Sequence, residues 1–452
     1  MFRRLLIANR GEVAARVLKT CQRLGIETVA VASAADLGSA WLEGATTVVP
    51  LGPARSAESY LDASAILEVA LHHGCSALHP GWGFLSENAI FARRCEAAGI
   101  SFVGPDPHHM ALMGDKARAR DTMKALGMPV IPGSEGALSD LEEARRLADE
   151  IGYPVLLKAV AGGGGRGMRG VEAPDGLADA WRDATAEAIS CFGDGRLYLE
   201  KRIVEGRHVE VQILADAFGT VVHLGERECS VQRRHQKVVE EAPSPGLSPS
   251  ERERVLPVVA DAVRRSGYRN AGTVEMLLDQ GGGLYFMELN TRLQVEHSVT
   301  EEVTGLDLVE LQLRIAANER LPLSQGSIQH QGHAIEFRIN AEDPALDFRP
   351  GPGRITQLSF PEGPGIRVDT HLRGGDRIPP NYDSMVAKLI VSGPDRDTAL
   401  ERSRAAIAAT VVEGVPTNLA LHAAILEWDA FTSGRYHTKS LEEDLHTLVG
   451  GA

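Results

Sequence analysis

Short apolar runs alternate with helical patterns at the start of this 452-residue chain. Apolar runs at residues 5–8 and 28–32 flank a helical pattern at 13–24, and further apolar runs follow at 77–78 and 101–103. Because parallel strands need a crossover helix between them, this order favours an open, Rossmann-like parallel sheet. The turn after the first run lacks G-x-G-x-x-G, so we assign no dinucleotide to it.

The composition is that of a folded, acidic protein. The chain has 61 Asp+Glu against 47 Lys+Arg, a net charge of −14, and 43% hydrophobic residues. A duplex nucleic-acid binder needs a basic surface, and no stretch approaches the roughly 18 apolar residues of a membrane span. The first apolar run is too short for a signal peptide. We therefore expect a cytoplasmic protein with neither nucleic acid nor membrane as a partner, and five free cysteines.

The middle of the chain carries further elements. A helical pattern at 111–126 includes Lys116 and ends at Gly127-Met128-Pro129, and residues 132–203 have the elements of a small module. The expected elements from 141 onward are a helix at 141–151, strands at 154–159, 168–171, 197–200, 208–215 and 220–226, a helix at 254–266 and a hairpin at 273–290. A Pro- and Gly-rich stretch at 348–366 indicates loops.

A glycine run follows an apolar run that contains a lysine. Lys158 lies just upstream of Gly162-Gly163-Gly164-Gly165. Consecutive glycines disfavour regular structure but let backbone N–H groups wrap a phosphate chain, to which the lysine adds charge. The run also matches G-x-G-x-x-G, although no helical pattern follows it as a dinucleotide loop requires. A phosphate loop, a dinucleotide loop and a plain surface loop remain the interpretations.

The hairpin places two carboxylates opposite each other. If 273–278 and 284–290 pair around Gly281-Gly282, Glu275 faces Glu288. Such carboxylates have Cβ atoms about 5 Å apart and repel each other, so a cation between them is expected. Oxygen ligands favour magnesium or manganese over zinc. The alternative is a solvated acidic face in another register.

A polar row continues from the second strand of this hairpin. If the segment stays extended, alternate residues share one face: Glu288, Asn290, Arg292, Gln294 and Glu296. Such a row could lead from metal ligands, through an arginine able to grip an oxyanion, to a carboxylate placed as a base. An alternating polar strand is otherwise most often solvent-exposed. The basic run 232–237 could likewise supply cations to an anionic substrate or be a solvated face.

Together these motifs resemble the ATP-grasp superfamily, specifically the biotin carboxylase family. The resemblance covers nearly the whole chain, and it rests on the hairpin, on residues 288–297 and on further motifs. The motifs are Ile7-Ala8-Asn9-Arg10-Gly11-Glu12, His79-Pro80-Gly81-Trp82-Gly83-Phe84-Leu85-Ser86-Glu87-Asn88, Met113-Gly114-Asp115-Lys116, Glu288-Leu289-Asn290-Thr291-Arg292-Leu293-Gln294-Val295-Glu296-His297 and Arg338-Ile339-Asn340-Ala341-Glu342-Asp343-Pro344.

The resemblance implies an α/β fold with an α+β ATP-grasp core. Its parts would be an N-terminal Rossmann-like domain at 1–113, an ATP-grasp domain at 114–325 with a mobile lid at about 132–203, and a C-terminal biotin carboxylase domain at 326–446 before a tail at 447–452. ATP and Mg²⁺ (or Mn²⁺) would be its cofactors. The nucleotide would be bound by Lys116, Lys158, Gly163, Gly164, Gly165, Glu200, Lys201, Ile203, His208, Gln232 and His235, and the metal by Glu275, Glu288 and Asn290.

The resemblance also implies the chemistry. Lys237, Arg292, Gln294 and the Val295 backbone would seat bicarbonate, and Glu296 would deprotonate it for attack on the γ-phosphate. The resulting carboxyphosphate would yield carbon dioxide and phosphate, the phosphate would take the biotin ureido proton, and Arg338 would stabilise the enolate. The catalytic residues would be Glu296, Arg292, Lys237 and Arg338, with Arg338 and Trp82 at biotin.

Two residues depart from the family pattern. Trp82 stands where tyrosine is common, near the biotin entrance, and Ser298 follows His297 where proline is usual. The first removes a phenol hydroxyl, which puts biotin contacts there in doubt. The second loosens the backbone just after the expected base.

The expected partners are a biotin carboxyl carrier protein, carboxyltransferase subunits and a second copy of this chain. The chain's only Met-Lys pair, Met123-Lys124, lies in a helical pattern, so we expect biotin to arrive on another chain. The complete enzyme would be an acetyl-CoA carboxylase of fatty acid biosynthesis, or else a pyruvate, propionyl-CoA or other acyl-CoA carboxylase.

Three other functions remain as alternatives. A different ATP-grasp ligase would release ADP with an amine or carboxylate acceptor and be indifferent to biotin. A dinucleotide oxidoreductase would bind NADH and not ATP. A non-catalytic assembly subunit would tolerate Glu296→Gln.

Overall fold

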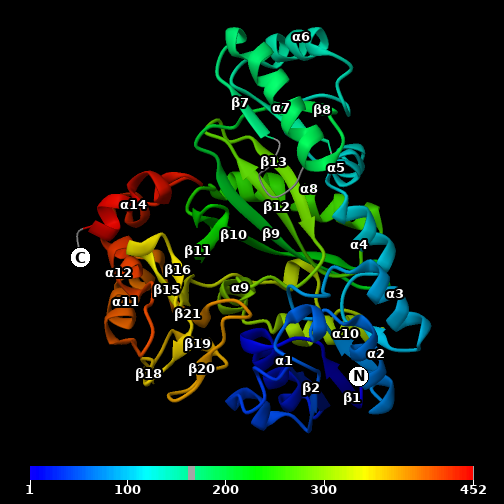
Figure 1. Cartoon of the computed structure of the whole chain (residues 1–452), viewed down its shortest axis with the longest axis vertical. Coiled ribbons are helices and arrows are strands. Elements are labelled where there is room, and N and C mark those ends of the chain that lie inside the picture. Colours follow the sequence, from blue (N-terminus) through cyan, green and yellow to red (C-terminus); the bar gives the residue numbers. More distant parts are fainter. Residues whose placement is uncertain (161–167, 451–452) are drawn as a thin grey trace. The chain divides into compact units, whose positions relative to one another are not determined.

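The computed structural model describes residues 1–160 and 168–450 (Figure 1). These residues form two compact units. The first unit comprises Met1–Gly114, Arg207–Glu275 and Leu289–Ala452, and the second comprises Asp115–Gly206 and Met276–Glu288. The expected division at 1–113, 114–325 and 326–446 stays a prediction.

The first unit opens with a five-stranded parallel sheet in the order β3-β2-β1-β4-β5. Its central strand β1 buries Leu5, Leu6 and Ile7 completely, as a strand covered on both faces requires. The expected α/β class is confirmed. The strands are β1 (Arg4–Ile7), β2 (Glu27–Ala32), β3 (Thr47–Pro50), β4 (Ala77–His79) and β5 (Ser101–Phe102), and the helices are α1 (Gly11–Arg23), α2 (Ala63–His72), α3 (Ala89–Ala97) and α4 (Pro107–Gly114). Strand β3 was not predicted, because its residues alternate between half-buried and exposed.

The largest sheet has eight strands in the order β13-β12-β9-β10-β11-β14-β21-β19. These strands are β9 (Arg207–Ala215), β10 (Val221–Arg233), β11 (Gln236–Ala242), β12 (Asn270–Leu278), β13 (Leu284–Asn290), β14 (His333–Asn340), β19 (Ile366–Thr370) and β21 (Met385–Gly393). Strand β10 extends seven residues past the predicted end at 226, because β11 pairs with its far half. The basic run 232–237 is therefore the tip of a hairpin.

Helices and short strands complete the first unit. The helices are α8 (Pro249–Ser266), α9 (His297–Thr304), α10 (Leu308–Ala316), α11 (Arg396–Ala409), α12 (Leu419–Glu427), α13 (Asp429–Thr432) and α14 (Ser440–Gly450). Helix α8 begins five residues before the predicted start at 254, since Ser248 and Glu251 form a capping box. The short strands are β15 (Glu342–Asp343), β16 (Arg349–Pro350), β17 (Gly353–Arg354), β18 (Gln357–Ser359), β20 (Arg377–Ile378) and β22 (Val411–Glu413).

The second unit holds a three-stranded antiparallel sheet in the order β7-β6-β8. Leu157 of β6 and Leu199 of β8 are fully buried in its core beside Leu177. Within residues 115–206 its elements are α5 (Lys116–Ala125), α6 (Leu141–Ile151), β6 (Val155–Ala159), β7 (Met168–Val171), α7 (Leu177–Phe192) and β8 (Leu197–Lys201), and residues 276–288 add the end of β12 and most of β13.

The expected single helix at 111–126 is wrong. Helix α4 ends at Gly114, and α5 begins at Lys116 because the Asp115 side chain accepts the Arg118 N–H at 3.1 Å, which is an N-cap. All five cysteines lie among the described residues and are free. Across residues 1–160 and 168–450, no helix is both long and apolar enough to cross a membrane.

Phe337 tests the core beneath β14. Its side chain is fully buried against other apolar residues of β21, α11 and α12. We expect Phe337→Ala to lower the free energy of unfolding by about 3–5 kcal/mol, through lost transfer energy and a cavity. Urea-induced unfolding measures this. The matched control is Ile90→Ala on α3, where the side chain is 74% exposed and the expected loss is below about 0.5 kcal/mol. Equal losses in the two variants would contradict the placement of Phe337.

Candidate active site

Lys237 lies at the centre of a cluster of buried carboxylates in the first unit. Its Nζ lies 2.6 Å from Glu210 Oε2 and 3.2 Å from Glu275 Oε1, and it also pairs with Glu296. Strands β11, β9 and β12 supply the first three residues, and the turn before α9 supplies Glu296. Burial opposes the charged form of Lys237, but the surrounding carboxylates raise its pKa well above the ordinary value. The ammonium is therefore charged at every physiological pH.

Glu296 reaches the same cluster, but its backbone conformation differs from the expected one. Strand β13 ends at Asn290, and a turn leads to α9, so the predicted extended row from 288 to 296 is wrong. The turn nevertheless directs the Glu296 carboxylate to Lys237 and to Arg338, whose Nη2 lies 2.9 Å from Oε2. Burial and Glu210 raise the pKa of Glu296, but the two cations outweigh them and hold it below its ordinary value. Glu296 is thus a buried, ionised carboxylate.

Arg227 and Glu210 were not predicted. Arg227 is fully buried, and its guanidinium donates to Glu210 Oε1 at 2.6 Å and to Gln294 Oε1 at 3.2 Å. It therefore orients both a carboxylate and an amide of the cluster. Glu210 alternates with His208 along β9, and this period-two pattern could have revealed it. No local pattern marks Arg227, because its partners are distant in sequence.

Three of the four predicted bicarbonate residues, Arg292, Gln294 and Val295, lie along the turn from β13 to α9, and the fourth, Lys237, lies on β11. The Gln294 amide donates to Glu275 Oε1 at 2.8 Å, and both residues are buried. Arg292 instead donates through Nε to Glu87 Oε2 at 3.1 Å, and Glu87 also accepts the Thr291 N–H. The structure thus joins Gln294 to the Lys237 cluster, whereas the Arg292 guanidinium pairs with Glu87.

Gln232 and His235 lie at the hairpin of β10 and β11. Gln232 is buried and directly opposite Lys237 in the register. His235 is exposed at the turn with a positive φ of 64°, next to Arg234. The basic run is therefore divided: Lys237 enters the cluster, whereas Arg234 and His235 form an exposed tip.

The chemistry of a metal site is present around Glu275. Burial raises the pKa of Glu275, but Lys237 and His208 outweigh this and bring it to about 2. His208 Nε2 is buried without a hydrogen-bond partner among the described residues and lies 3.4 Å from Glu275 Oε2. Of the predicted ligands, Glu275 and the buried Asn290 belong to the first unit and Glu288 to the second. Their oxygen donors suit Mg²⁺ or Mn²⁺.

In the second unit, the two lysines predicted to bind phosphate each pair with a carboxylate. Lys116 Nζ lies 2.8 Å from Glu288 Oε2, and Lys158 of β6 pairs with Glu200 of β8. Ammonium groups are flexible phosphate binders, so the phosphates of a nucleotide could replace the carboxylates as the partners of both lysines.

The other predicted nucleotide residues of this unit differ in their contacts. Lys201 Nζ donates to the Gly152 and Tyr153 carbonyls, each at 2.9 Å, so its side chain is committed to the backbone. Ile203 is half-buried just after β8. The glycine loop that carries Gly163, Gly164 and Gly165 lies outside the described residues.

Hydrogen bonds from Asn9 hold the backbone on either side of Gly81, including that of Trp82. The Asn9 amide donates to the Trp82 carbonyl at 2.8 Å and to the Pro80 carbonyl at 2.6 Å. Gly81 between them has a φ of +63°, and a Cβ there would lie 2.9 Å from Asn9 Nδ2, so the turn requires glycine. The Trp82 indole Nε1 is buried without a hydrogen-bond partner in residues 1–160 and 168–450.

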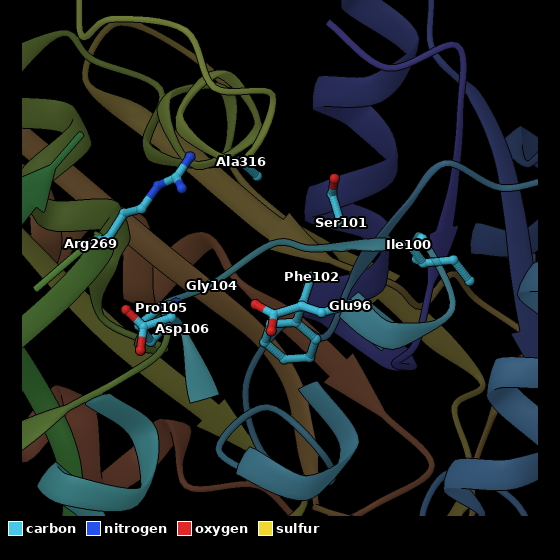
Figure 2. Close-up of a pocket in the computed structure, with 10 residues that line it drawn as sticks. Glu96, Ile100, Ser101, Phe102, Gly104, Pro105, Asp106, Arg269 and Ala316 are labelled. Carbon is cyan, nitrogen blue, oxygen red and sulfur yellow. The ribbon is translucent and has the colours of Figure 1, made fainter. Parts of the chain in front are cut away.

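A separate cavity of about 340 Å³ lies in the first unit (Figure 2). None of the predicted site residues lines it. Two of its charged residues already have partners: Arg269 donates to the Ile315 carbonyl at 2.9 Å, and Asp106 pairs with His109 at 2.7 Å. We therefore place the candidate active site at the Lys237 cluster and not at this cavity.

Glu240 gives the cluster a pH dependence. Burial raises the pKa of Glu240 to about 7, although Arg338 Nε lies 2.6 Å away and opposes the shift. Between its ordinary value of 4.5 and about 7, the folded state keeps a proton that the unfolded chain has released, so the stability that Glu240 contributes falls as pH rises.

We expect Glu240→Gln, which does not titrate, to gain thermal stability relative to the wild type between pH 5 and pH 8. Thermal midpoints of both proteins at the two pH values measure this. If the difference in thermal midpoint between the two proteins were the same at both pH values, the raised pKa of Glu240 would be contradicted.

Family models match most of the chain. Residues 1–110 match the biotin carboxylase N-terminal domain, 115–324 the ATP-binding domain of the carbamoyl-phosphate synthase L chain, and 336–443 the biotin carboxylase C-terminal domain. Biotin carboxylase of Nostoc sp. is 50% identical over 442 residues, which cover 98% of this chain and 99% of that protein. A component of the pyruvate carboxylase of Methanothermobacter thermautotrophicus is 48% identical, and the match covers 98% of this chain and 90% of that protein.

Solved structures agree with these matches. The biotin carboxylase domain dimer of Hydrogenobacter thermophilus 2-oxoglutarate carboxylase, with MgADP, ADP and bicarbonate, has a TM-score of 0.90 at 47% identity and covers 99% of each chain. Biotin carboxylase of Campylobacter jejuni, in a complex with β,γ-ATP, has a TM-score of 0.91 at 44% identity, with 98% and 99% covered. The expected fold class and family are confirmed, and the chain belongs to the biotin carboxylase family of ATP-grasp enzymes.

Proposed function

We propose that this chain catalyses the ATP- and bicarbonate-dependent carboxylation of biotin, the first half-reaction of a biotin-dependent carboxylase. The observation that carries the proposal is the buried Glu296 carboxylate held between Lys237 and Arg338. A base beside two cations is the arrangement needed to deprotonate an anion. Relatives named biotin carboxylase at about half identity support the same activity.

Bicarbonate would enter the cluster by exchanging with carboxylates. Its oxygens would take contacts of Lys237 and Arg338 that Glu296 now holds, which withdraws positive charge from Glu296 and raises its basicity. Glu296 then takes the bicarbonate proton, and the bicarbonate oxygen attacks the γ-phosphorus of ATP as ADP leaves. Carboxyphosphate divides into carbon dioxide and phosphate, the phosphate takes the ureido proton, and Arg338 stabilises the biotin enolate that attacks carbon dioxide.

ATP and Mg²⁺ are the proposed cofactors. When bound, the metal neutralises phosphate charge for phosphoryl transfer. Glu275, Asn290 and Glu288 would hold it through oxygen atoms, while Lys116 and Lys158 would bind the phosphates. The structure with MgADP and bicarbonate is that of a relative at 47% identity, which supports this assignment.

We further propose that biotin arrives on a separate carrier protein in the cytoplasm, that carboxyltransferase subunits use the product, and that the chain forms a homodimer. A dimer is named for the Hydrogenobacter thermophilus domain. The acceptor that the complete enzyme carboxylates is proposed to be acetyl-CoA. A pyruvate carboxylase is the second candidate, because a component of such an enzyme is 48% identical to this chain.

ADP release tests the activity. The purified chain with ATP, Mg²⁺ and bicarbonate should release ADP faster when free biotin is added, measured by a coupled spectrophotometric assay. No stimulation by biotin at saturating ATP, Mg²⁺ and bicarbonate would count against the proposal. Stimulation by an amine or another carboxylate instead would favour a different ATP-grasp ligase.

Glu296→Gln tests the base. We expect turnover to fall by about 10²- to 10⁴-fold, the range for loss of a general base. The thermal midpoint should change little, because glutamine keeps the shape and both Lys237 and Arg338 keep another carboxylate partner. Glu253→Gln on α8, an exposed position, is the matched control and should keep wild-type turnover. Wild-type turnover in Glu296→Gln would exclude the base role of Glu296.

Trp82→Tyr tests the biotin entrance. If the indole stacks on or crowds biotin, the apparent KM for biotin should change while the affinity for ATP without bicarbonate stays as in the wild type. Steady-state kinetics and equilibrium nucleotide binding measure the two quantities. Equal effects on both would refute the placement of Trp82 at biotin.

A further inference from the structure

Lys388 is a fully buried lysine that the proposed chemistry does not use. It lies on β21, directly opposite Arg338 on β14 and Asp369 on β19. Residues opposite each other in a sheet project from the same face, so Lys388 and Arg338 lie side by side. Helix α9 packs on β14 and β21, which brings the turn before it to these two cations.

The Lys388 ammonium contacts that turn, the start of α9 and two carboxylates. Its Nζ donates to the Val295 carbonyl at 2.8 Å and to Ser298 Oγ at 2.7 Å. It lies 3.1 Å from Glu12 Oε1 on α1 and 3.7 Å from Asp369 Oδ2. The carbonyl and the hydroxyl take two of the three N–H donors of the ammonium, and Glu12 adds an ion pair without a hydrogen bond.

The contact with Val295 fixes the backbone of the base. The Val295 carbonyl and the Glu296 N–H belong to one planar peptide unit, so holding the carbonyl fixes the plane from which the Glu296 side chain starts. The preceding peptide unit is held too, because His297 Nδ1 lies 2.7 Å from the Gln294 carbonyl. A trans peptide N–H points opposite its carbonyl, so the Val295 N–H points away from His297.

We propose that Lys388 is a positioning residue for the general base Glu296. Arg338 holds the Glu296 carboxylate, and Lys388 holds the peptide unit behind it, so two neighbouring residues of one sheet fix both ends of the base. This inference rests on the proposed function, because Lys388 would fix the geometry of the base that the proposed reaction uses.

A purely structural role explains the arrangement less well. Replacing a buried ion pair with apolar residues is often neutral or stabilising, so stability alone does not require a lysine here. Asp369 also has its own partner, because Arg367 donates to its carboxylate at 2.7 and 3.0 Å. Among the contacts of Lys388, the hydrogen bond to the Val295 carbonyl is the one that holds the backbone beside the base.

Ser298, which stands where the family resemblance predicts proline, also contacts Lys388. Its hydroxyl accepts from Lys388, and it lies at the second position of α9, where a proline would fit the helix but offer no acceptor. Compared with a proline, the serine leaves the backbone less rigid but adds a side-chain contact to the Lys388 ammonium.

The test uses the double variant Glu12→Gln/Lys388→Met in the full chain. Lys388→Met alone leaves Glu12 buried without its cation and risks unfolding, whereas the double variant removes both charges. We expect a thermal midpoint near that of the wild type, kcat/KM for bicarbonate lower by about 10- to 100-fold because the base is misplaced, and KM for ATP within about 2-fold, less than a single lost hydrogen bond costs. Bicarbonate kinetics like those of the wild type in a folded double variant would overturn the proposal.

Ser298→Ala is the matched control. It removes one contact of the same ammonium and keeps the Val295 carbonyl contact, so its effect on bicarbonate kinetics should be much smaller. A loss as large as that of the double variant would show that the carbonyl contact is not the important one.

Amide hydrogen exchange separates this inference from the proposed function. If the wild type releases no ADP with biotin, the proposed function fails, and exchange alone decides the role of Lys388. Faster exchange in peptides covering 294–298 of the double variant, with unchanged exchange in the core strands, would support positioning of this turn. Unchanged exchange at 294–298 would overturn it.

Discussion

Arg338 and Lys388 face each other across β14 and β21, and like charges directly opposite in a ladder destabilise a sheet. Each cation is therefore matched with carboxylates from elements distant in sequence. Glu240 and Glu296 pair with Arg338, and Glu12 pairs with Lys388. This one constraint draws together the first helix of the N-terminal sheet, the middle of the large sheet and the turn before α9. The candidate active site is formed where these elements meet.

The same electrostatic logic explains why the cluster suits both an anion and a metal ion. Around Lys237, three carboxylates are matched by three cations, because Arg227 also pairs with Glu210 and Arg338 with Glu296. A divalent cation would find carboxylate oxygen ligands here, and an incoming anion would compete with the carboxylates for the cations. The net charge of −14 describes the whole molecule and says little about such a site.

Local patterns predicted much of the fold. Helix 141–151 and strand 168–171 have the predicted bounds, because their periodicity and flanking signals are local. The break at Asp115 was missed, since a single capping side chain interrupts an otherwise continuous helical pattern. The predicted extended row from Glu288 to Glu296 was wrong for a different reason. The chain leaves the strand after Asn290, and a turn followed by the start of α9 positions Glu296.

The site itself was predicted in part. Family motifs pointed to Lys237, Glu275 and Glu296, and the structure brings these three together, although Lys237 and Glu296 are 59 positions apart. Arg227, Glu240 and Lys388 have no local signature, because a buried charge is defined by partners from other elements. Whether Glu275 faces Glu288 stays a prediction.

The division of the chain into two units has an evolutionary consequence. The carboxylate cluster around Lys237, with Arg338 and Trp82, lies wholly in the first unit, whereas Lys116 and Lys158 belong to the second. Sequence drift within 115–206 can therefore alter how tightly a nucleotide is held without replacing any side chain of the cluster. Selection can adjust nucleotide affinity and carboxylation chemistry as largely separate traits.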